Sequence, residues 1–318
     1  MNRKKIIILV SASVAIILAS LFLGGGAINP FTTDPLSKEI IFSLRLPRLL
    51  TALIVGASLG ASGAVLQGIL RNPLSDPYIL GISSGAALSA ATGLVLSITA
   101  AGYFSLPLLA FVGAISSCVI VGVLGKKNES FTPERLLLAG IGLGFLFTAI
   151  LMLLMSLSND YGVRRTLLWI FGDLSYSGWS LMPYGFILSA LGLGAAISRS
   201  NALNALALGD EFAHSLGFSP SKERFIFFVA ASLMTAVSVT MGGIIGFVGL
   251  LIPHAVRFFV GSGARLLLPL SALAGATFLA LADAVGKTVL SPTEIPSGII
   301  TSIIGAPYFI YLIRRHGR

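Results

Sequence analysis

The chain has 318 residues, of which 55% are hydrophobic and only 10% are charged, and its mean hydropathy is +0.95. A soluble domain usually carries about 25% charged residues, so this chain has too few polar side chains to coat a water-soluble core. The net charge of +9 comes from basic residues that lie between apolar runs and form no continuous patch. This pattern argues against nucleic acid as a partner and indicates a chain oriented in a lipid bilayer.

The sequence contains one cysteine, Cys118, inside a long apolar run. A single cysteine forms no internal disulfide, and we interpret it as a small buried hydrophobic side chain. No group of histidine, cysteine or carboxylate residues has the spacing of a metal site or of a catalytic site. The sequence therefore predicts no metal, no cofactor and no catalytic residue on this chain.

Ten apolar stretches are long enough to cross a bilayer, which takes about 20 residues of α-helix. The first begins with basic residues, as a secretory signal does, but no soluble domain follows it, so we interpret it as an uncleaved span. We therefore predict an all-α integral membrane fold with ten transmembrane helices in a single domain over residues 1–318. In chain order the predicted spans are residues 6–23, 47–70, 77–100, 107–125, 135–157, 180–198, 225–242, 244–261, 265–286 and 296–313.

An even number of spans places both termini on the same side of the membrane. If that side is the cytoplasm, six of the 21 lysines and arginines lie outside and the remaining 15 lie inside. This bias follows the positive-inside rule, and the opposite topology would reverse it, so we predict cytoplasmic termini. The six predicted outer residues are Lys38, Arg45, Arg48, Arg164, Arg165 and Lys287.

The stretch Gly286–Thr288 reads Gly-Lys-Thr, which is how a phosphate-binding loop ends. The complete motif needs a glycine five positions before Gly286, but Leu281 occupies that position. A long apolar run precedes the stretch, where the motif requires a short strand. We therefore reject an ATP site, and the predicted topology places Lys287 at the outer mouth together with Arg45 and Arg48.

Polar side chains within the spans are few and mild. Asp283 is the one ionisable residue that clearly falls inside a span, about one turn from its outer end. Proton- or sodium-coupled carriers usually need several such groups, so their scarcity counts against a self-powered transporter. Ser297 and Thr301 are examples of hydroxyl groups that could line a neutral path or bond to carbonyls of their own helix, which is the commoner case. Gly140 and Gly144 have the spacing of a close helix–helix contact.

The longest predicted inner connection covers residues 199–224 and is too polar to span the membrane. Leu203, Leu206, Phe212 and Leu216 have helical spacing, and Gly209 divides the segment. It is therefore predicted to form two short surface helices. Spacing alone leaves two alternatives open: the apolar stripe docks a partner, or it folds back onto the ends of the spans.

Several blocks of this sequence resemble the FecCD-type permeases, the membrane subunits of type II ABC importers for vitamin B12, iron–siderophores and haem. The stretch RLPRLLTALIVGASLGASGAVLQGILRNPLSDPYILGISSGA resembles the family signature. The later blocks LNALALGDEFAHSLG, GFVGLLIPHAVRF and EIPSGIITSIIGAPYFIYLI follow in the family's order, and together the blocks cover residues 45–313.

The resemblance implies a homodimer with a translocation path between two ten-helix subunits. Two ATPase subunits would sit on the cytoplasmic side and carry ATP and Mg, and an extracytoplasmic binding protein would deliver the substrate. Residues that match the family's docking positions are Arg45, Arg48 and Lys287, the last replacing an arginine. Residues that match its ATPase-coupling segment are Leu203, Leu206, Gly209, Phe212, Ala213, Leu216 and Gly217. Residues expected along the path, on the spans 135–157 and 296–313, are Gly140, Gly144, Thr148, Ser297 and Thr301.

The expected function is therefore that of a non-catalytic importer permease in a prokaryotic cytoplasmic (inner) membrane. An iron(III)–siderophore or another iron chelate is the favoured cargo, because such systems are the most numerous in the family. Vitamin B12 and haem are alternatives within it, and some relatives carry oxyanions. A stand-alone channel or secondary transporter is the main alternative from another class, and an integral-membrane enzyme is a further one.

Overall fold

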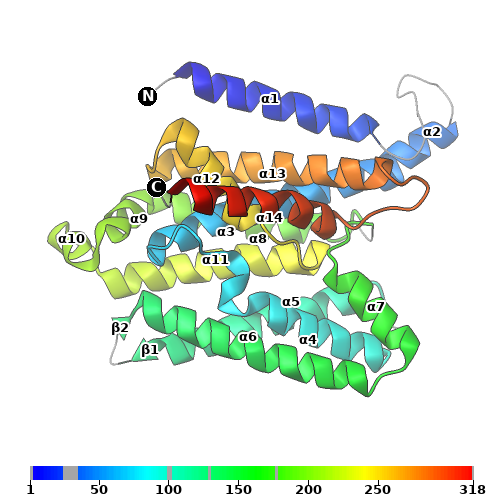
Figure 1. Cartoon of the computed structure of the whole chain (residues 1–318), viewed down its shortest axis with the longest axis horizontal. Coiled ribbons are helices and arrows are strands. Elements are labelled where there is room, and N and C mark those ends of the chain that lie inside the picture. The colour runs from blue at the N-terminus through cyan, green and yellow to red at the C-terminus, as the bar shows by residue number, and fades with distance from the viewer. Residues whose placement is uncertain (1–2, 24–34, 99–101, 128–129, 176–177, 317–318) are drawn as a thin grey trace.

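The computed structural model describes residues 3–23, 35–98, 102–127, 130–175 and 178–316, and Figure 1 shows a bundle of roughly parallel and antiparallel helices. A small antiparallel hairpin of β1 (Lys126–Lys127) and β2 (Ser130–Phe131) is the only sheet in the part of the chain so described. The apolar helices are α1 (Arg3–Phe22), α3 (Leu46–Ile69), α4 (Ile82–Val95), α5 (Ser105–Gly125), α6 (Pro133–Ser156), α8 (Met182–Ser198), α11 (Pro220–Gly242), α12 (Val248–Val260), α13 (Ala264–Thr288) and α14 (Ser297–His316). The shorter helices are α2 (Pro35–Ile40), η1 (Ile41–Arg45), η2 (Pro77–Leu80), α7 (Asp160–Ile170), α9 (Ser200–Leu208) and α10 (Asp210–Ser215).

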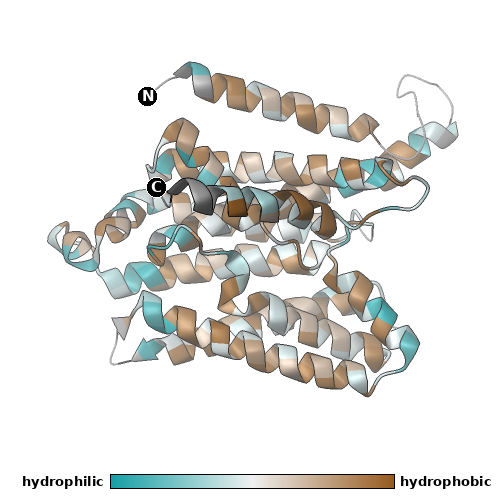
Figure 2. Cartoon of the chain, viewed as in Figure 1, coloured by the Kyte–Doolittle hydropathy of each residue, from teal (hydrophilic) through white to brown (hydrophobic). Residues whose placement is uncertain are grey.

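Each of the ten predicted spans coincides with one of these apolar helices. By length and composition, five helices can cross a membrane, or six if α8 and α9, which meet at 63°, count as one bent span. Four further apolar helices are shorter. Figure 2 shows apolar residues along the helices and polar ones gathered toward the two ends of the bundle. The prediction of an all-α fold with several membrane-compatible helices is confirmed.

Among the helix boundaries that differ from the prediction, three have a local backbone reason. The second span begins earlier, since helix runs unbroken from Ser37 to Ile69 through the π-helical turn η1. The third begins as a 3₁₀ turn and becomes α-helical only after Gly81, whose φ of +72° ends that turn; its predicted last residues, 99–100, lie outside the described residues. The span predicted to begin at 244 starts at Val248, because Gly243 and Phe247 both have positive φ.

Helix α3 lies at the centre of the bundle and packs against α13, α11 and α12. Glycines let these backbones approach closely. A Cβ added at Gly56 would lie 2.3 Å from the carbonyl oxygen of Gly275 on α13, and one at Gly63 would lie 1.9 Å from that of Gly249 on α12. Such contacts are typical of membrane helices, where small residues allow close van der Waals packing.

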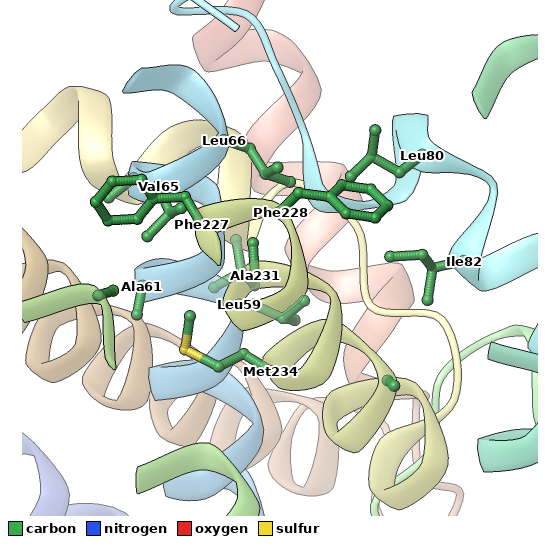
Figure 3. Packing of buried hydrophobic residues seen from close by; sticks show 14 of the residues in the cluster. Leu59, Ala61, Val65, Leu66, Leu80, Ile82, Phe227, Phe228, Ala231 and Met234 are labelled. Carbon is green, nitrogen blue, oxygen red and sulfur yellow. The ribbon is translucent and has the colours of Figure 1, made fainter. Parts of the chain in front are cut away.

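A second layer, formed by α4, α5 and α6, is joined to α3 through α11 (Figure 1). Figure 3 shows Phe228 of α11 between Leu66 of α3 and Leu80, while Phe227 of α11 points the opposite way, toward Val65 of α3. These side chains are fully buried and belong to one core cluster. The close fit positions η2 and the start of α4 against the central helices.

Candidate functional site

A cluster of charged side chains lies where the start of α3, the end of α13 and the start of α14 meet. The carboxylate of Asp283 forms one ion pair with Arg48 at 2.9 Å and another with Lys287 at 2.7 Å. Ser297 donates a hydrogen bond to the same carboxylate at 2.9 Å, and Arg48 also pairs with Glu294 at 2.6 Å. We call these five residues the outer cluster, because the predicted topology places them at the outer end.

The outer cluster is largely buried, and its positive and negative charges are equal in number. Asp283 is 2% exposed, and Arg48 and Lys287 are each 11% exposed, whereas Glu294 is 45% exposed. Two cations therefore face two carboxylates. A carboxylate buried to this extent is stable in its charged form only when cations and donors surround it. The outer cluster holds α3, α13 and α14 of this chain to one another.

Sequence reasoning placed Arg48, Lys287 and Asp283 at the same end of the bundle but did not pair them. The four-residue spacing between Asp283 and Lys287 on one helix was an available signal. Nothing local to Glu294 in the sequence indicates Arg48 as its partner. Arg45 lies one turn before Arg48, is half-buried, and donates to the carbonyl of Phe22 at 3.4 Å. The docking role of the three basic residues stays a prediction.

The 199–224 connection forms two short helices at the opposite end of the bundle, as predicted (Figure 1). Gly209 separates them with φ +135° and ψ +158°, a conformation that other residues rarely adopt. Asp210 and Glu211 occupy the first turn of α10, where carboxylates suit the helix dipole. The start of α1 and the last turns of α14 lie at this same end.

The apolar stripe of this segment divides into a buried part, which folds back onto the bundle, and an exposed part, for which docking of a partner stays a prediction. Leu203, Leu206 and Ala213 are buried within the chain, and Leu203 packs against Gly68 of α3. Phe212 and Leu216 of the second half are 45% and 56% exposed. The first helix therefore folds back onto the bundle, and the second presents apolar side chains outward, followed by Gly217 at φ +83°.

The five residues expected along the translocation path all make contacts within this chain. Gly140 lies against the backbone of Ile79 and Leu80, and Gly144 faces Gly81 and Ser84. The hydroxyls bond locally: Thr148 donates to the Gly144 carbonyl at 2.8 Å, Thr301 donates to that of Gly298 at 3.0 Å, and Ser297 belongs to the outer cluster. Their place on a path between two subunits stays a prediction.

The FecCD transport family model matches residues 8–315, which is nearly the whole chain. The chain belongs to the FecCD transport family. The resemblance inferred from the sequence blocks is thereby confirmed.

Named relatives of this FecCD member include permeases for several cargoes. It is 37% identical to the Fe(3+)-citrate import system permease protein YfmE of Bacillus subtilis, over 100% of this chain and 97% of the relative. It is 39% identical to the hemin transport system permease protein HmuU of Yersinia pestis, over 90% and 86% of the two chains. A solved ABC transporter described as of metal-chelate type, in an inward-facing conformation, matches with a TM-score of 0.90 and 33% identity, covering 99% of this chain and 100% of that one.

Proposed function

We propose that this FecCD-family chain is the membrane-spanning permease subunit of a binding-protein-dependent ABC importer. The observation that carries the proposal is the agreement of sequence and fold with such transporters along nearly the whole chain. Ten spans in one domain over residues 1–318, both termini in the cytoplasm and a location in a prokaryotic inner membrane complete the proposal. The first helix begins and the last helix ends at the same end of the bundle, which supports an even number of spans.

The proposed assembly is a homodimer with two ATP-binding subunits on the cytoplasmic side and a binding protein on the other. The chain itself makes and breaks no covalent bond, and ATP and Mg belong to the partner ATPase. Exposed apolar residues on α6, among them Leu138 and Phe145, support a surface covered by lipid or a second subunit. ATP binding and hydrolysis would move α10, and the spans would alternate between outward and inward access.

An iron(III)–siderophore or another iron chelate is the cargo we propose. The Fe(3+)-citrate relative and the metal-chelate transporter support it, and each aligns with nearly all of this chain. Haem and vitamin B12 are the alternatives, since relatives named for hemin and for vitamin B12 align at similar identity. The binding protein encoded with the permease decides among them through the ligand it retains.

Reconstitution in liposomes with and without the ATPase tests the proposed function. Uptake of a labelled ferric chelate should require the ATPase, the binding protein and ATP together. A stand-alone channel or secondary transporter would instead take up cargo with the permease alone. Uptake that persists without the ATPase would reject the importer proposal.

Phe212→Asp is expected to release the ATPase while the permease stays folded. The side chain is about half exposed, so a charge there costs the fold little but removes apolar contact area from the proposed interface. Phe212→Leu keeps an apolar surface and should retain the ATPase. Co-purification of the two subunits measures the effect, and undiminished recovery of the ATPase with Phe212→Asp would contradict the contact.

Arg45→Glu is expected to weaken binding-protein capture about tenfold at low ionic strength and much less at 0.5 M salt. Arg45 is the better target among the three basic residues, because reversing Lys287 would place an acid beside the buried Asp283. Lys38→Glu changes the net charge equally on the same continuous helix and serves as the control. Equal capture by both variants across the salt series would reject a specific role for Arg45.

A further inference from the structure

A buried arginine near the start of α11 joins three separate parts of the end of the bundle that carries α9 and α10. Arg224 is 1% exposed. Its guanidinium donates to Asp210 at 2.6 Å, to the carbonyl of Phe131 at 2.6 Å and to the carbonyl of Ile69 at 3.4 Å. These acceptors belong to the first turn of α10, to β2 and to the last residue of α3. One side chain therefore links elements that are far apart in the sequence.

The helix that carries Arg224 does not by itself explain its presence. A cation near a helix N-terminus gains nothing from the helix dipole, whose positive end lies there. Burying a guanidinium costs several kcal/mol unless it is paired and hydrogen-bonded. The tertiary contacts offset that cost, so the position of the residue is explained by what it connects.

The hairpin contact extends this link to α6, the first predicted path helix. Phe131 is buried and is followed by Thr132, the N-cap residue of α6. Its ring packs edge-on against Phe228 of α11, with ring centroids 5.5 Å apart. Arg224 holds the carbonyl of Phe131 and α11 holds its ring, so the start of α6 cannot shift relative to α11 without breaking both contacts.

The α10 contact depends on Asp210. Its carboxylate also pairs with Arg71, which follows the end of α3, and this second pair is partly open to solvent. Glu211 is adjacent in the same first turn but is exposed and forms no ion pair with any residue that the structure describes. The chain thus offers two neighbouring acids, of which one carries the link and the other does not.

We propose that Arg224 is a positioning residue that makes α9, α10 and the inner ends of α3 and α6 move as one body. The proposal rests on the proposed function, because it needs a partner ATPase to act on α10. Arginine suits the role, since its planar fork carries five N–H donors and reaches acceptors in three directions. A lysine keeps the charge, but its single ammonium cannot reproduce that geometry.

The test uses the complete transporter, reconstituted with its ATPase and binding protein, and compares Asp210→Ala, Arg224→Lys and the control Glu211→Ala. Both link variants should retain the ATPase and hydrolyse ATP, while cargo uptake per ATP falls about tenfold, which corresponds to losing one hydrogen bond to a charged group. Glu211→Ala should match the unmodified protein. The double variant should be no worse than the more severe single one, since both break the same link.

Uptake per ATP unchanged in Asp210→Ala would overturn the proposal. Cargo uptake by the unmodified permease without an ATPase would instead reject the proposed function, so the two failures are distinguishable.

A second measurement covers variants that fold poorly. It uses spin labels attached at Leu208→Cys and Glu134→Cys, in a Cys118→Ser background. The distribution of distances between the labels on α9 and α6 should stay narrow, with an unchanged mean, when ATP binds, and it should broaden with Asp210→Ala. The proposal would also be overturned if the distance distribution of Asp210→Ala were as narrow as that of the unmodified permease. It would equally be overturned if the distance in the unmodified permease changed when ATP binds.

Discussion

Asp283→Ala is expected to destabilise the permease by about 3–5 kcal/mol, the usual cost of removing one partner from a buried ion pair. The carboxylate is 2% exposed and holds Arg48, Lys287 and Ser297. Its loss leaves the buried Lys287 without the carboxylate with which it pairs, and leaves Arg48 paired with Glu294 alone. Thermal unfolding in detergent, followed by tryptophan fluorescence, should show a midpoint lower by at least about 6 °C.

Two further variants make this prediction specific to the outer cluster. Glu294→Ala removes a carboxylate that is about half exposed, so its cost should stay below about 1 kcal/mol. Asp283→Ala combined with Lys287→Ala removes both the acid and the cation it leaves behind, so the double variant should be more stable than Asp283→Ala alone. A midpoint for Asp283→Ala that equals that of Glu294→Ala would show that the cluster does not fasten the three helices.

The outer cluster also bears on the proposed docking of a binding protein. Arg48 and Lys287 already face carboxylates of their own chain, so acids on a partner would meet a balanced site and would have to compete with Asp283 and Glu294. Glu294 is the more exposed of these two acids and is the easier one to displace. For this reason we expect Arg48 and Lys287 to contribute less to the salt dependence of docking than their charges alone would suggest.

Gly63→Ala is expected to cost about 3 kcal/mol, at the upper end of the usual range for overpacking. The added Cβ would lie 1.9 Å from the carbonyl oxygen and 2.6 Å from the carbonyl carbon of Gly249. Both atoms are backbone, so no side-chain rotation relieves the clash, and α3 and α12 must separate. The yield of monodisperse protein and the thermal midpoint in detergent measure the effect.

Gly194→Ala is the matched control for this substitution. Gly194 also lies inside an apolar helix, α8, but a Cβ there has no atom of another element within 4 Å. Alanine is the better helix former by up to about 1 kcal/mol, so the midpoint should stay the same or rise slightly. If both variants unfold at the same temperature, the α3–α12 contact is looser than described.

Much of the fold could be predicted from the sequence because apolar length decides where helices form in lipid. A buried backbone in a bilayer must satisfy its own hydrogen bonds, so each long apolar run becomes a helix. The breaks at Gly81 and Phe247 were missed, since a break inside an apolar run does not change its composition. Counting spans also placed Arg48 and Lys287 at one end, where the structure brings them together.

The sequence by itself determined that this is a multi-pass membrane protein of the FecCD type, where its helices run and where the 199–224 connection divides at Gly209. These properties follow from hydropathy, glycine conformation and residue order, which depend on near neighbours in the chain. Only the tertiary structure decided that Arg224 is a buried link, that Asp283 joins two cations, and that Leu206 is buried while Phe212 is exposed. The Arg224–Asp210 and Arg48–Asp283 pairs join residues 14 and 235 positions apart, and no local pattern encodes that they will meet, whereas the Asp283–Lys287 pair has the four-residue spacing of one helix.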